Sequence, residues 1–215
     1  MSQIKLKHSG GNSVIIAAPD SNPASDRTLK LPSNADGTVL TTTNPKSGNI
    51  IQVVTTSDSE RIERTSTSIS GGTANMVDIM SLAITPSSSS SKILISAYLF
   101  GEITGNPYGV NFRIKAAISG GSTSFIQGAD TGARLPVFGT FDEYQTDSNV
   151  DSTPHQYVVV PNYLHSPSTS STITYSITLR TSSTETFYKN RSIGGGDGTS
   201  YEDGLSYITL MEVAG

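Results

Sequence analysis

The sequence predicts an all-β protein, and three observations support that prediction. Apolar residues make up 34% and charged residues 15% of the 215 residues, so small polar residues, above all Ser and Thr, are abundant. Ser, Thr, Gly, Asn and Pro are poor or mediocre helix formers, whereas Thr, Val, Ile and Tyr suit a pleated surface. The apolar stretches are short, often alternate with polar residues, and end at turn-forming residues, as strands do.

The first 46 residues are predicted to form a separate module of short strands. Its apolar bursts are Ile4–Leu6, Val14–Ala17, Leu29–Leu31 and Val39–Leu40. The segment contains no aromatic residue and no cysteine, and its size is close to the limit at which one chain can still build a sufficient core. We therefore expect residues 1–46 to be an anchor and oligomerisation module in which copies of the chain intertwine, most simply as a homotrimer.

A turn-rich stretch, Asn44–Asn49, predicts the boundary, and residues 47–215 are predicted to form an antiparallel β-sandwich of the jelly-roll kind. All six Phe and nine Tyr lie between Tyr98 and Tyr207, so this second domain holds the main hydrophobic core. A short turn of helix is also expected within Thr73–Met80.

The strands expected in the second domain fall into three groups. Two alternate strictly between apolar and polar residues and predict sheets with one dry face, namely Val110–Ser119 and Thr172–Arg180. Three are apolar on both faces and are expected to be covered twice, by a second sheet and by a loop or a neighbouring subunit, namely Lys92–Phe100, Gln156–Pro161 and Tyr207–Val213. Less regular strands are expected at Ile50–Thr56, Glu60–Ile69 and Leu82–Thr85.

Charge and composition exclude several classes of function. The formal charge is −4 with no basic cluster, so nucleic acid is not an expected partner. No apolar run is long enough to span a membrane, and the first residues lack the apolar region of a secretion signal. The absence of cysteine excludes disulfides, thiolate nucleophiles and cysteine-based zinc sites. The protein is expected to be soluble and unsecreted.

No catalytic or metal-binding pattern stands out in the sequence, and neither a cofactor nor a metal is expected. His8 is expected to be exposed in the small module, and His155 and His165 could approach each other but lack a spaced carboxylate or a third ligand for zinc. The G-x-S-x-G elbow of many serine hydrolases is absent. A pair of catalytic carboxylates of the glycosidase kind remains an open alternative, because the separation of two carboxyl groups cannot be deduced from sequence. Asp142 and Glu143 are adjacent and would point to opposite faces if extended. The candidates expected in polar loops are Glu102, Asp130, Asp147 and Asp151.

Two loops have partial ligand patterns. Asp147–Asp151 has the alternating oxygen ligands of a calcium loop but lacks its sixth-position Gly and twelfth-position Glu, so an Asx-rich turn is the simpler interpretation. Gly194–Gly198 is rich in glycine, but no Lys-Ser or Lys-Thr follows it, and it is interpreted as a pliable loop.

Recognition is a better-supported expectation than catalysis. Aromatic rings in polar loops can bind a sugar or a protein surface, although tyrosines also cover sandwich ends and subunit interfaces. The receptor-binding candidates are Tyr108, Tyr144, Tyr163, Tyr188 and Tyr201, which are all expected in loops.

Several stretches resemble structural fibre proteins of tailed phages that infect marine bacteria. IKLKHSGGNSVIIAAP and DRTLKLPSNADGTVLTT are similar to the amino-terminal module of such fibres. GNIIQVVTT, LAITPSSSSSKILISAYL and SYITLMEV are similar to their distal domain. The resemblance leaves out the middle of the chain, from Gly101 to Asn162. It implies a homotrimeric virion appendage that is anchored at one end and exposes a jelly-roll-like tip.

The sequence therefore predicts a non-enzymatic virion protein, made in the host cytoplasm, that acts as a phage tail fibre or appendage. Its expected partners are copies of itself, other virion proteins bound through the amino-terminal module, and a glycan or protein on the host surface. Two alternatives remain open, which are a capsid decoration protein and a glycan depolymerase.

Overall fold

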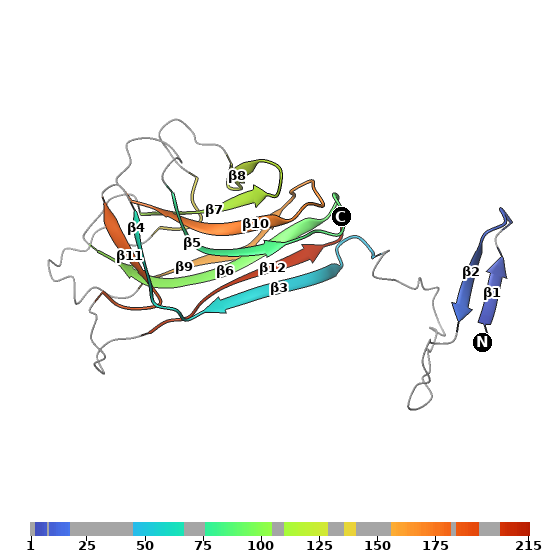
Figure 1. The fold of residues 1–215 in the computed structure, drawn as a ribbon, viewed down its shortest axis with the longest axis horizontal. Coiled ribbons are helices and arrows are strands. Elements are labelled where there is room, and N and C mark those ends of the chain that lie inside the picture. The colour runs from blue at the N-terminus through green and yellow to red at the C-terminus, as the bar shows by residue number, and fades with distance from the viewer. Residues whose placement is uncertain are drawn as a thin grey trace, which may run out of the picture. The chain divides into compact units, whose positions relative to one another are not determined.

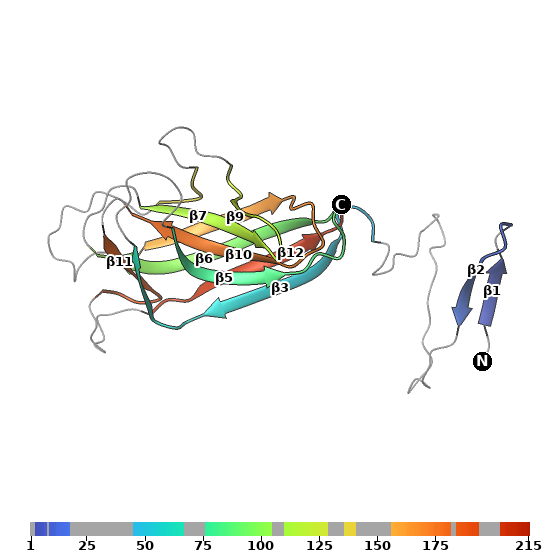
Figure 2. The same ribbon diagram turned by 45° about the horizontal axis from the view of Figure 1, so that its top comes forward.

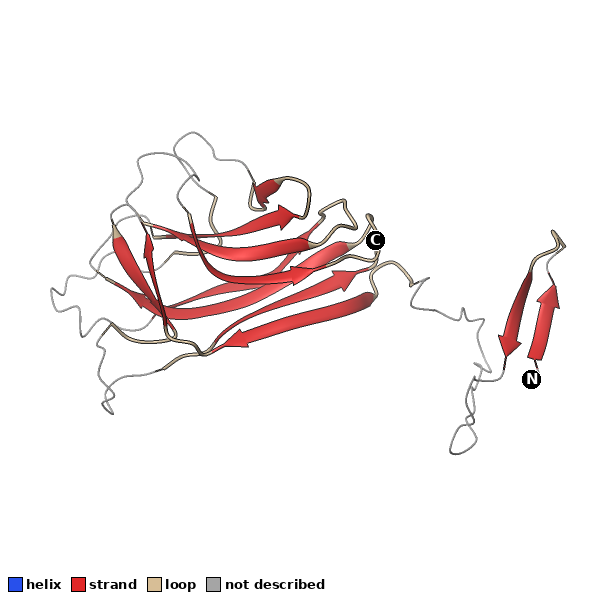
Figure 3. Cartoon of the chain, in the orientation of Figure 1, coloured by secondary structure: helices blue, strands red, loops and turns tan. Residues whose placement is uncertain are grey.

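A computed structural model describes residues 3–7, 9–17, 45–66, 76–104, 110–128, 136–140, 156–181, 184–193 and 203–215. The chain divides into two compact units, Met1–Val39 and Leu40–Gly215, which are described separately. Every regular element in the described residues is a β-strand, and all paired strands are antiparallel (Figure 3). The predicted all-β class is confirmed.

The first unit contains a two-stranded hairpin of β1 (Gln3–Lys7) and β2 (Ser13–Ala17). Its register pairs Ile4 with Ile16 and Leu6 with Val14, so Leu6 and Ile16 lie on the same face. Their side chains are 59% and 60% exposed. The predicted strands at Leu29–Leu31 and Val39–Leu40 lie outside the described residues, as does His8.

The second unit is a jelly roll, and its strand pairing shows why. Four antiparallel pairs are nested in the chain: β3 with β12, β5 with β10, β6 with β9, and β7 with β8. A single long ribbon that turns back between β7 and β8 produces this nesting. Rolling up the ribbon adds the pairs β12 with β6 and β10 with β7. The eight strands are β3 (Ile50–Asp58), β5 (Val77–Ile84), β6 (Lys92–Ile103), β7 (Asn111–Ile118), β8 (Thr123–Phe125), β9 (Gln156–His165), β10 (Ile173–Arg180) and β12 (Ser206–Val213).

The rolled ribbon forms two sheets, which we call the β3-β12-β6-β9 sheet and the β5-β10-β7-β8 sheet (Figure 1). Two four-stranded antiparallel sheets with this nesting define the jelly-roll architecture. The sheets pack face to face (Figure 2), and aliphatic and aromatic side chains fill the space between them. The fully buried ones include Ile95 and Leu210 from the first sheet and Ile114 and Tyr175 from the second.

Two further strands extend one end of the β3-β12-β6-β9 sheet. They are β4 (Ile62–Ser66) and β11 (Glu185–Lys189), which pair with each other. β11 also pairs with Gly101–Ile103 of β6. These residues lie beyond Tyr98, the last residue of β6 that pairs with β12. β11 and the short strand β8 are not among the strands expected from the sequence, because both are short and lack a regular apolar pattern.

The structure corrects two local predictions. The helical turn expected within Thr73–Met80 is wrong for its described part, because β5 begins at Val77 and pairs with β10. The strand expected to end at Pro161 continues to His165. Directly after the proline, Asn162 adopts a left-handed backbone with φ of 45°, and the register with β6 shifts at this point. That shift is a β-bulge, which accommodates the proline without ending the strand.

Candidate functional site

The strand directions give the jelly roll two different ends. The chain enters β3 at the end where β12 finishes, and backbone hydrogen bonds join Gly48 and Asn49 to Ala214, each with an N···O distance of 2.8 Å. We call this the proximal end. At the opposite, distal end, β3, β6 and β10 finish and β5, β7, β9 and β12 begin. The proximal connections are short, such as Thr85–Ser91 and Ser119–Ser122, whereas the longer connections all lead to the distal end.

A buried polar cluster lies at the distal end and joins four strands. Asn190 follows β11, is fully buried, and has a left-handed backbone with φ of 60°. Its side-chain nitrogen donates to the carbonyl oxygens of Asp58 (2.6 Å) and Glu60 (3.1 Å), and its side-chain oxygen accepts from the Ser206 hydroxyl (2.6 Å). The amide of Phe100 in β6 donates to the same hydroxyl (3.1 Å). These contacts fix the ends of β3, β6, β11 and β12 to one another.

Lys189 and Asp58 form an ion pair inside this distal polar cluster. The Lys189 side chain is 1% exposed, and its ammonium donates to the Asp58 carboxylate. Burial acts to raise the pKa of Asp58. The hydrogen bond from Lys189, the backbone N–H of Glu60 and the positive charge of Lys189 together outweigh burial and lower that pKa below its ordinary value. Because Lys189 is buried, its charge cannot be left without the Asp58 carboxylate, so the pair favours one particular arrangement of the distal strands.

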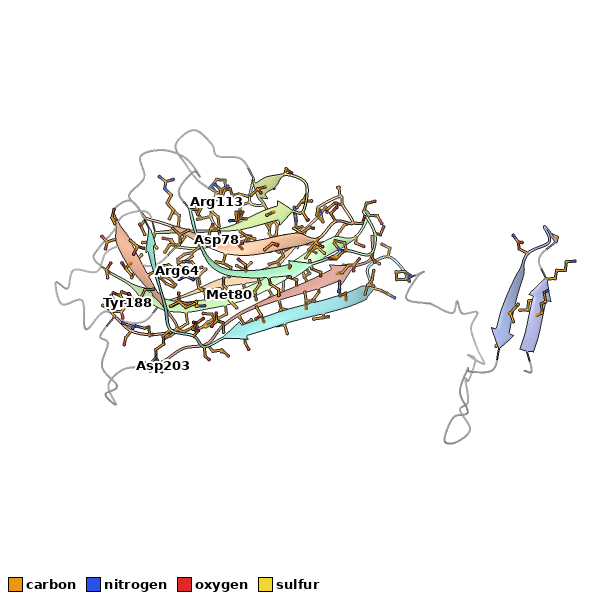
Figure 4. All side chains as sticks on the ribbon, viewed as in Figure 1. Arg64, Asp78, Met80, Arg113, Tyr188 and Asp203 are labelled. Atoms are coloured by element: carbon orange, nitrogen blue, oxygen red, sulfur yellow. The ribbon has the colours of Figure 1, made fainter. Side chains whose placement is uncertain are left out.

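Above this cluster, aromatic and charged side chains lie at the molecular surface. The Arg191 guanidinium lies over the Tyr188 ring, 4.7 Å from its centroid, and 3.6 Å from the Glu63 carboxylate. Arg61 binds Asp203 at 2.6 Å, and both of these side chains are about half exposed. Figure 4 shows Tyr188, Arg64 and Asp203 at this same end. Cation–π contacts and planar guanidinium donors occur at surfaces that bind polar ligands.

The structure describes two of the five tyrosine candidates, and it contradicts the expectation that they lie in loops. Tyr188 is in β11 at the distal end. Tyr163 is in β9 near the proximal end, half-buried against Phe138, and its hydroxyl donates to the Ile126 carbonyl at 2.8 Å. The structure therefore does not bring Tyr163 and Tyr188 together.

The other three candidates, Tyr108, Tyr144 and Tyr201, lie outside the described residues. In sequence they fall in the connections β6–β7, β8–β9 and β11–β12. The described strands on either side of these connections begin or end at the distal end, apart from β8. Of the five candidates, the structure itself places only Tyr188 at the distal end.

The remaining chemical candidates do not assemble into a reactive centre among the described residues. Glu102, expected in a loop, lies in β6, is 4% exposed, and accepts the Ile193 amide at 2.7 Å. His165 Nδ1 lies 2.8 Å from the Tyr175 hydroxyl, and burial lowers the pKa of His165 and raises that of Tyr175. No three His, Asp or Glu side chains in the described ranges gather as a metal site requires. His155, Asp130, Asp142, Glu143, Asp147–Asp151 and Gly194–Gly198 lie outside those ranges.

The proximal end has one notable pocket. It encloses about 380 Å³ and is lined by Pro45, Ile51, Ser87, Ser88, Ser90, Ser91, Ala214 and Gly215. Behind it, the buried Glu212 carboxylate accepts the Ser87 amide (2.7 Å) and hydroxyl (2.6 Å). Burial acts to raise the pKa of Glu212, but hydrogen bonds from Ser87 and Ser91 and from the backbone of Ser87 and Ser88 lower it overall. We interpret Glu212 as a structural anchor for the serine-rich turn.

Comparisons with known proteins add little to this picture. No protein-family model matches the sequence, and no curated protein matches it. Among solved structures, that of infectious bursal disease virus Gx strain aligns over 94% of this chain and 46% of its own, with 12% identity and a TM-score of 0.38. The VP2 subviral particle of the same virus aligns over 94% and 50%, with 13% identity and a TM-score of 0.36.

This chain therefore spans about half the length of those viral chains. The scores are too low to support an argument about family or function. The assignment of a jelly roll rests on the strand order alone. In the described part of the chain, no helix is long and apolar enough to cross a membrane.

Sequence reasoning did not identify the distal polar cluster. Lys189 and Asn190 lie 131 and 132 residues from their partner Asp58, and neither belongs to a recognisable motif. The local signal that was available is the polar Lys-Asn-Arg run directly after the aromatic pair Phe187 and Tyr188, which is typical of a strand end. Only the fold shows that this strand end lies beside the end of β3.

Proposed function

We propose that this protein is a non-enzymatic structural component of a virion: a homotrimeric phage tail fibre or appendage. Residues 1–46 would anchor the chain and associate with other copies and other virion proteins. Residues 47–215 would present the jelly roll to a glycan or protein of the host surface. The proposal agrees with the sequence resemblance to fibre proteins of tailed phages that infect marine bacteria.

The polarity of the jelly roll is the observation that supports this proposal best. The chain enters at the proximal end, where the turns are short and joined by hydrogen bonds. At the distal end, β9 and β12 begin after connections longer than any proximal one, and Tyr188 and Arg191 lie there. In sequence, Tyr108, Tyr144 and Tyr201 fall in connections whose flanking strands begin or end there, apart from β8. Loops carried by a rigid scaffold are the usual location of binding residues. An attachment protein requires this division between an anchored end and an exposed end.

The amino-terminal hairpin supports self-association. A lone two-stranded hairpin is at best marginally stable in water. Leu6 and Ile16 leave more than half of their surface exposed on one face, and covering that face by other copies would complete a small core. Three copies of a weak distal site would also bind a repetitive surface with higher avidity than one copy.

Adsorption to host cells tests the proposal. We expect the purified full-length protein to bind cells that its phage infects, and replacement of Tyr188, Tyr108, Tyr144 or Tyr201 by Ala to weaken binding. Tyr163→Phe is the control, because it keeps the ring in place at the proximal end. Undiminished binding by all four alanine variants would contradict the distal assignment.

Two alternatives predict different outcomes. A capsid decoration protein would bind isolated capsids stoichiometrically and would not adsorb to cells. A glycan depolymerase would release reducing ends from host polysaccharide. Labelling the protein in images of the particle would place it on the tail or the capsid and would decide between the first alternative and the proposal.

A further inference from the structure

The outer face of the β3-β12-β6-β9 sheet carries an apolar row that crosses all four strands. The register places Met211 opposite both Val53 and Leu94, and Leu94 opposite Leu164. Alternation along the strands directs these side chains away from the core, as their burial pattern shows. The row runs from the edge strand β3 to the edge strand β9 (Figure 1).

A second row lies nearer the distal end. Tyr207 is opposite Tyr98, and Tyr98 is opposite Val159. The two tyrosine rings stack with their centroids 5.8 Å apart and an angle of 13° between their planes. Between the two rows lie Thr55, Thr209 and Ser96 and, in β9, the exposed bulge residues Pro161 and Asn162. The face is therefore a broad surface of apolar, aromatic and hydroxyl groups.

Exposed apolar side chains are concentrated on this face. Of the ten large apolar side chains exposed in the described part of the chain, five lie here: Ile50 (56%), Val53 (54%), Val159 (43%), Leu164 (47%) and Tyr207 (39%). Single exposed apolar residues are ordinary, but a contiguous set marks an interaction surface.

The outer face of the opposite sheet serves as an internal comparison. There the register brings together Ser81, Ser176 and Lys115, and Lys115 pairs with Asp78 at 2.5 Å. A neighbouring row consists of Ala83, Thr174 and Ala117. Ser81 and Ala83 are exposed on this face, whereas Ser176 is buried. Small and charged residues are usual on the outer face of an antiparallel sheet. The two sheets of one domain thus have outer faces of different character.

Charge identifies the partner that the apolar face fits. We consider the part of this face that runs from the Tyr98–Tyr207 row to the proximal end. Among the described side chains that point outward there from β3, β12, β6 and β9, only Lys92 is ionised. Each chain carries a formal charge of −4, so identical chains repel, and a contact surface with little charge adds least to that repulsion. A face with a single ionised side chain, whose apolar rows are separated by hydroxyl groups, suits a second such face better than a hydrated glycan.

The chain order favours the same partner. β3, which carries Ile50 and Val53, is the first strand of the jelly roll, and the amino-terminal segment leads directly into it. Copies held together by that segment would have their β3 strands at high effective concentration.

We propose that the outer face of the β3-β12-β6-β9 sheet is a second interface between copies of this chain, separate from the amino-terminal module. Val53, Leu94, Met211 and Leu164 form its apolar row, and the Tyr98–Tyr207 stack forms its distal part. The inference rests on the proposed function in one respect, which is that the chain forms a homo-oligomer.

Single-cysteine cross-linking of the full-length protein tests this interface, because the natural sequence contains no cysteine. We would prepare Val53→Cys, Leu164→Cys and, as the matched control, Ala83→Cys, which is an exposed position on the other sheet. A short bis-maleimide should link copies of the first two variants and leave the control monomeric on denaturing gels. Adding Leu94→Glu to each of the first two variants should abolish the cross-link while the circular dichroism spectrum stays unchanged.

The outcomes separate this inference from the proposed function. If light scattering shows an oligomer but Val53→Cys and Leu164→Cys cross-link no more than Ala83→Cys, the interface is wrong and the homotrimer stands. If the full-length chain is monomeric at micromolar concentration, both the homotrimer and this interface are overturned. Selective cross-linking of the two variants that Leu94→Glu abolishes supports the interface.

Discussion

Asn190 combines two roles at one position of the distal polar cluster. Its left-handed backbone is tolerated better by Asn and Gly than by other residues, and its side chain makes three hydrogen bonds in a fully buried setting. The same residue therefore sets the direction of the chain after β11 and satisfies backbone carbonyls that follow β3. A buried carbonyl left without a partner costs free energy.

Replacing Asn190 should separate these two roles. We expect Asn190→Ala to lower the free energy of unfolding by about 2 to 4 kcal/mol, since it loses the hydrogen bonds and strains the backbone. Asn190→Gly should cost about 1 kcal/mol less, because glycine accepts the left-handed conformation. Urea unfolding of both variants measures the difference, and equal losses would show that the backbone conformation contributes nothing.

His165 should make the stability of the jelly roll depend on pH. Burial lowers its pKa below the ordinary value of 6.5, so the folded protein prefers the neutral imidazole. The associated stability is present above pH 6.5 and is lost as the pH falls from 6.5 towards the folded-state pKa.

The measurement compares urea midpoints of the wild type and His165→Gln at about pH 7.5 and pH 5.5. We expect a larger decrease in the wild type, because glutamine does not titrate. Parallel decreases in the two proteins would assign the pH dependence to other groups.

At the scale of elements, the strand pair β4–β11 depends on one close approach to β6. A side chain at Gly101 would collide with the Phe187 ring and with the Tyr188 carbonyl oxygen. The backbone oxygen cannot move without breaking the β6–β11 pairing at Tyr188 and Lys189. Glycine at this position therefore allows β11 to extend the sheet beyond β12.

We expect Gly101→Ala to release β11 and β4 while the two sheets of the jelly roll stay intact, at a cost of about 1 to 3 kcal/mol. Hydrogen exchange should show faster exchange in β4 and β11 and unchanged protection in β3 and β12. Ser96→Ala, on the outer face of the same strand, is the control. Uniform acceleration across the domain would mean that β11 is essential to the core.

For the whole molecule, the distribution of the core predicts which part folds alone. In the described chain, all residues of the contiguous buried hydrophobic cluster lie between Ile79 and Leu210, and none comes from the amino-terminal unit. The jelly roll also closes its own proximal end through the hydrogen bonds between Gly48, Asn49 and Ala214.

A chain that begins at Pro45 should therefore unfold cooperatively and keep the β-type circular dichroism spectrum of the full-length protein. We expect its self-association to weaken, because the amino-terminal module is gone while the outer face of the β3-β12-β6-β9 sheet remains. Thermal unfolding and light scattering at several concentrations check both points. Loss of cooperative unfolding would show that the amino-terminal unit contributes to the core.

The all-β class, the strands at Lys92, Val110, Thr172 and Tyr207, and the sandwich itself were predictable from the sequence, because alternation and turn residues are local signals. The sequence also predicted burial on both faces for Lys92–Phe100 and Tyr207–Val213, since no polar position interrupts the apolar ones regularly. Their inner residues do pack into the core, whereas an outer cover remains a proposal.

The tertiary structure alone decided which strands are neighbours, and the candidate site follows from that. Asp58 and Lys189 are distant in sequence and acquire their buried contact only when β3 and β11 end at the same place. Tyr163 and Tyr188 have similar polar or aromatic sequence surroundings but lie towards opposite ends of the domain. Local residue patterns specify strands because alternation and turns act over a few residues. The pairing of distant strands depends on how the ribbon rolls up, and no short segment contains that information.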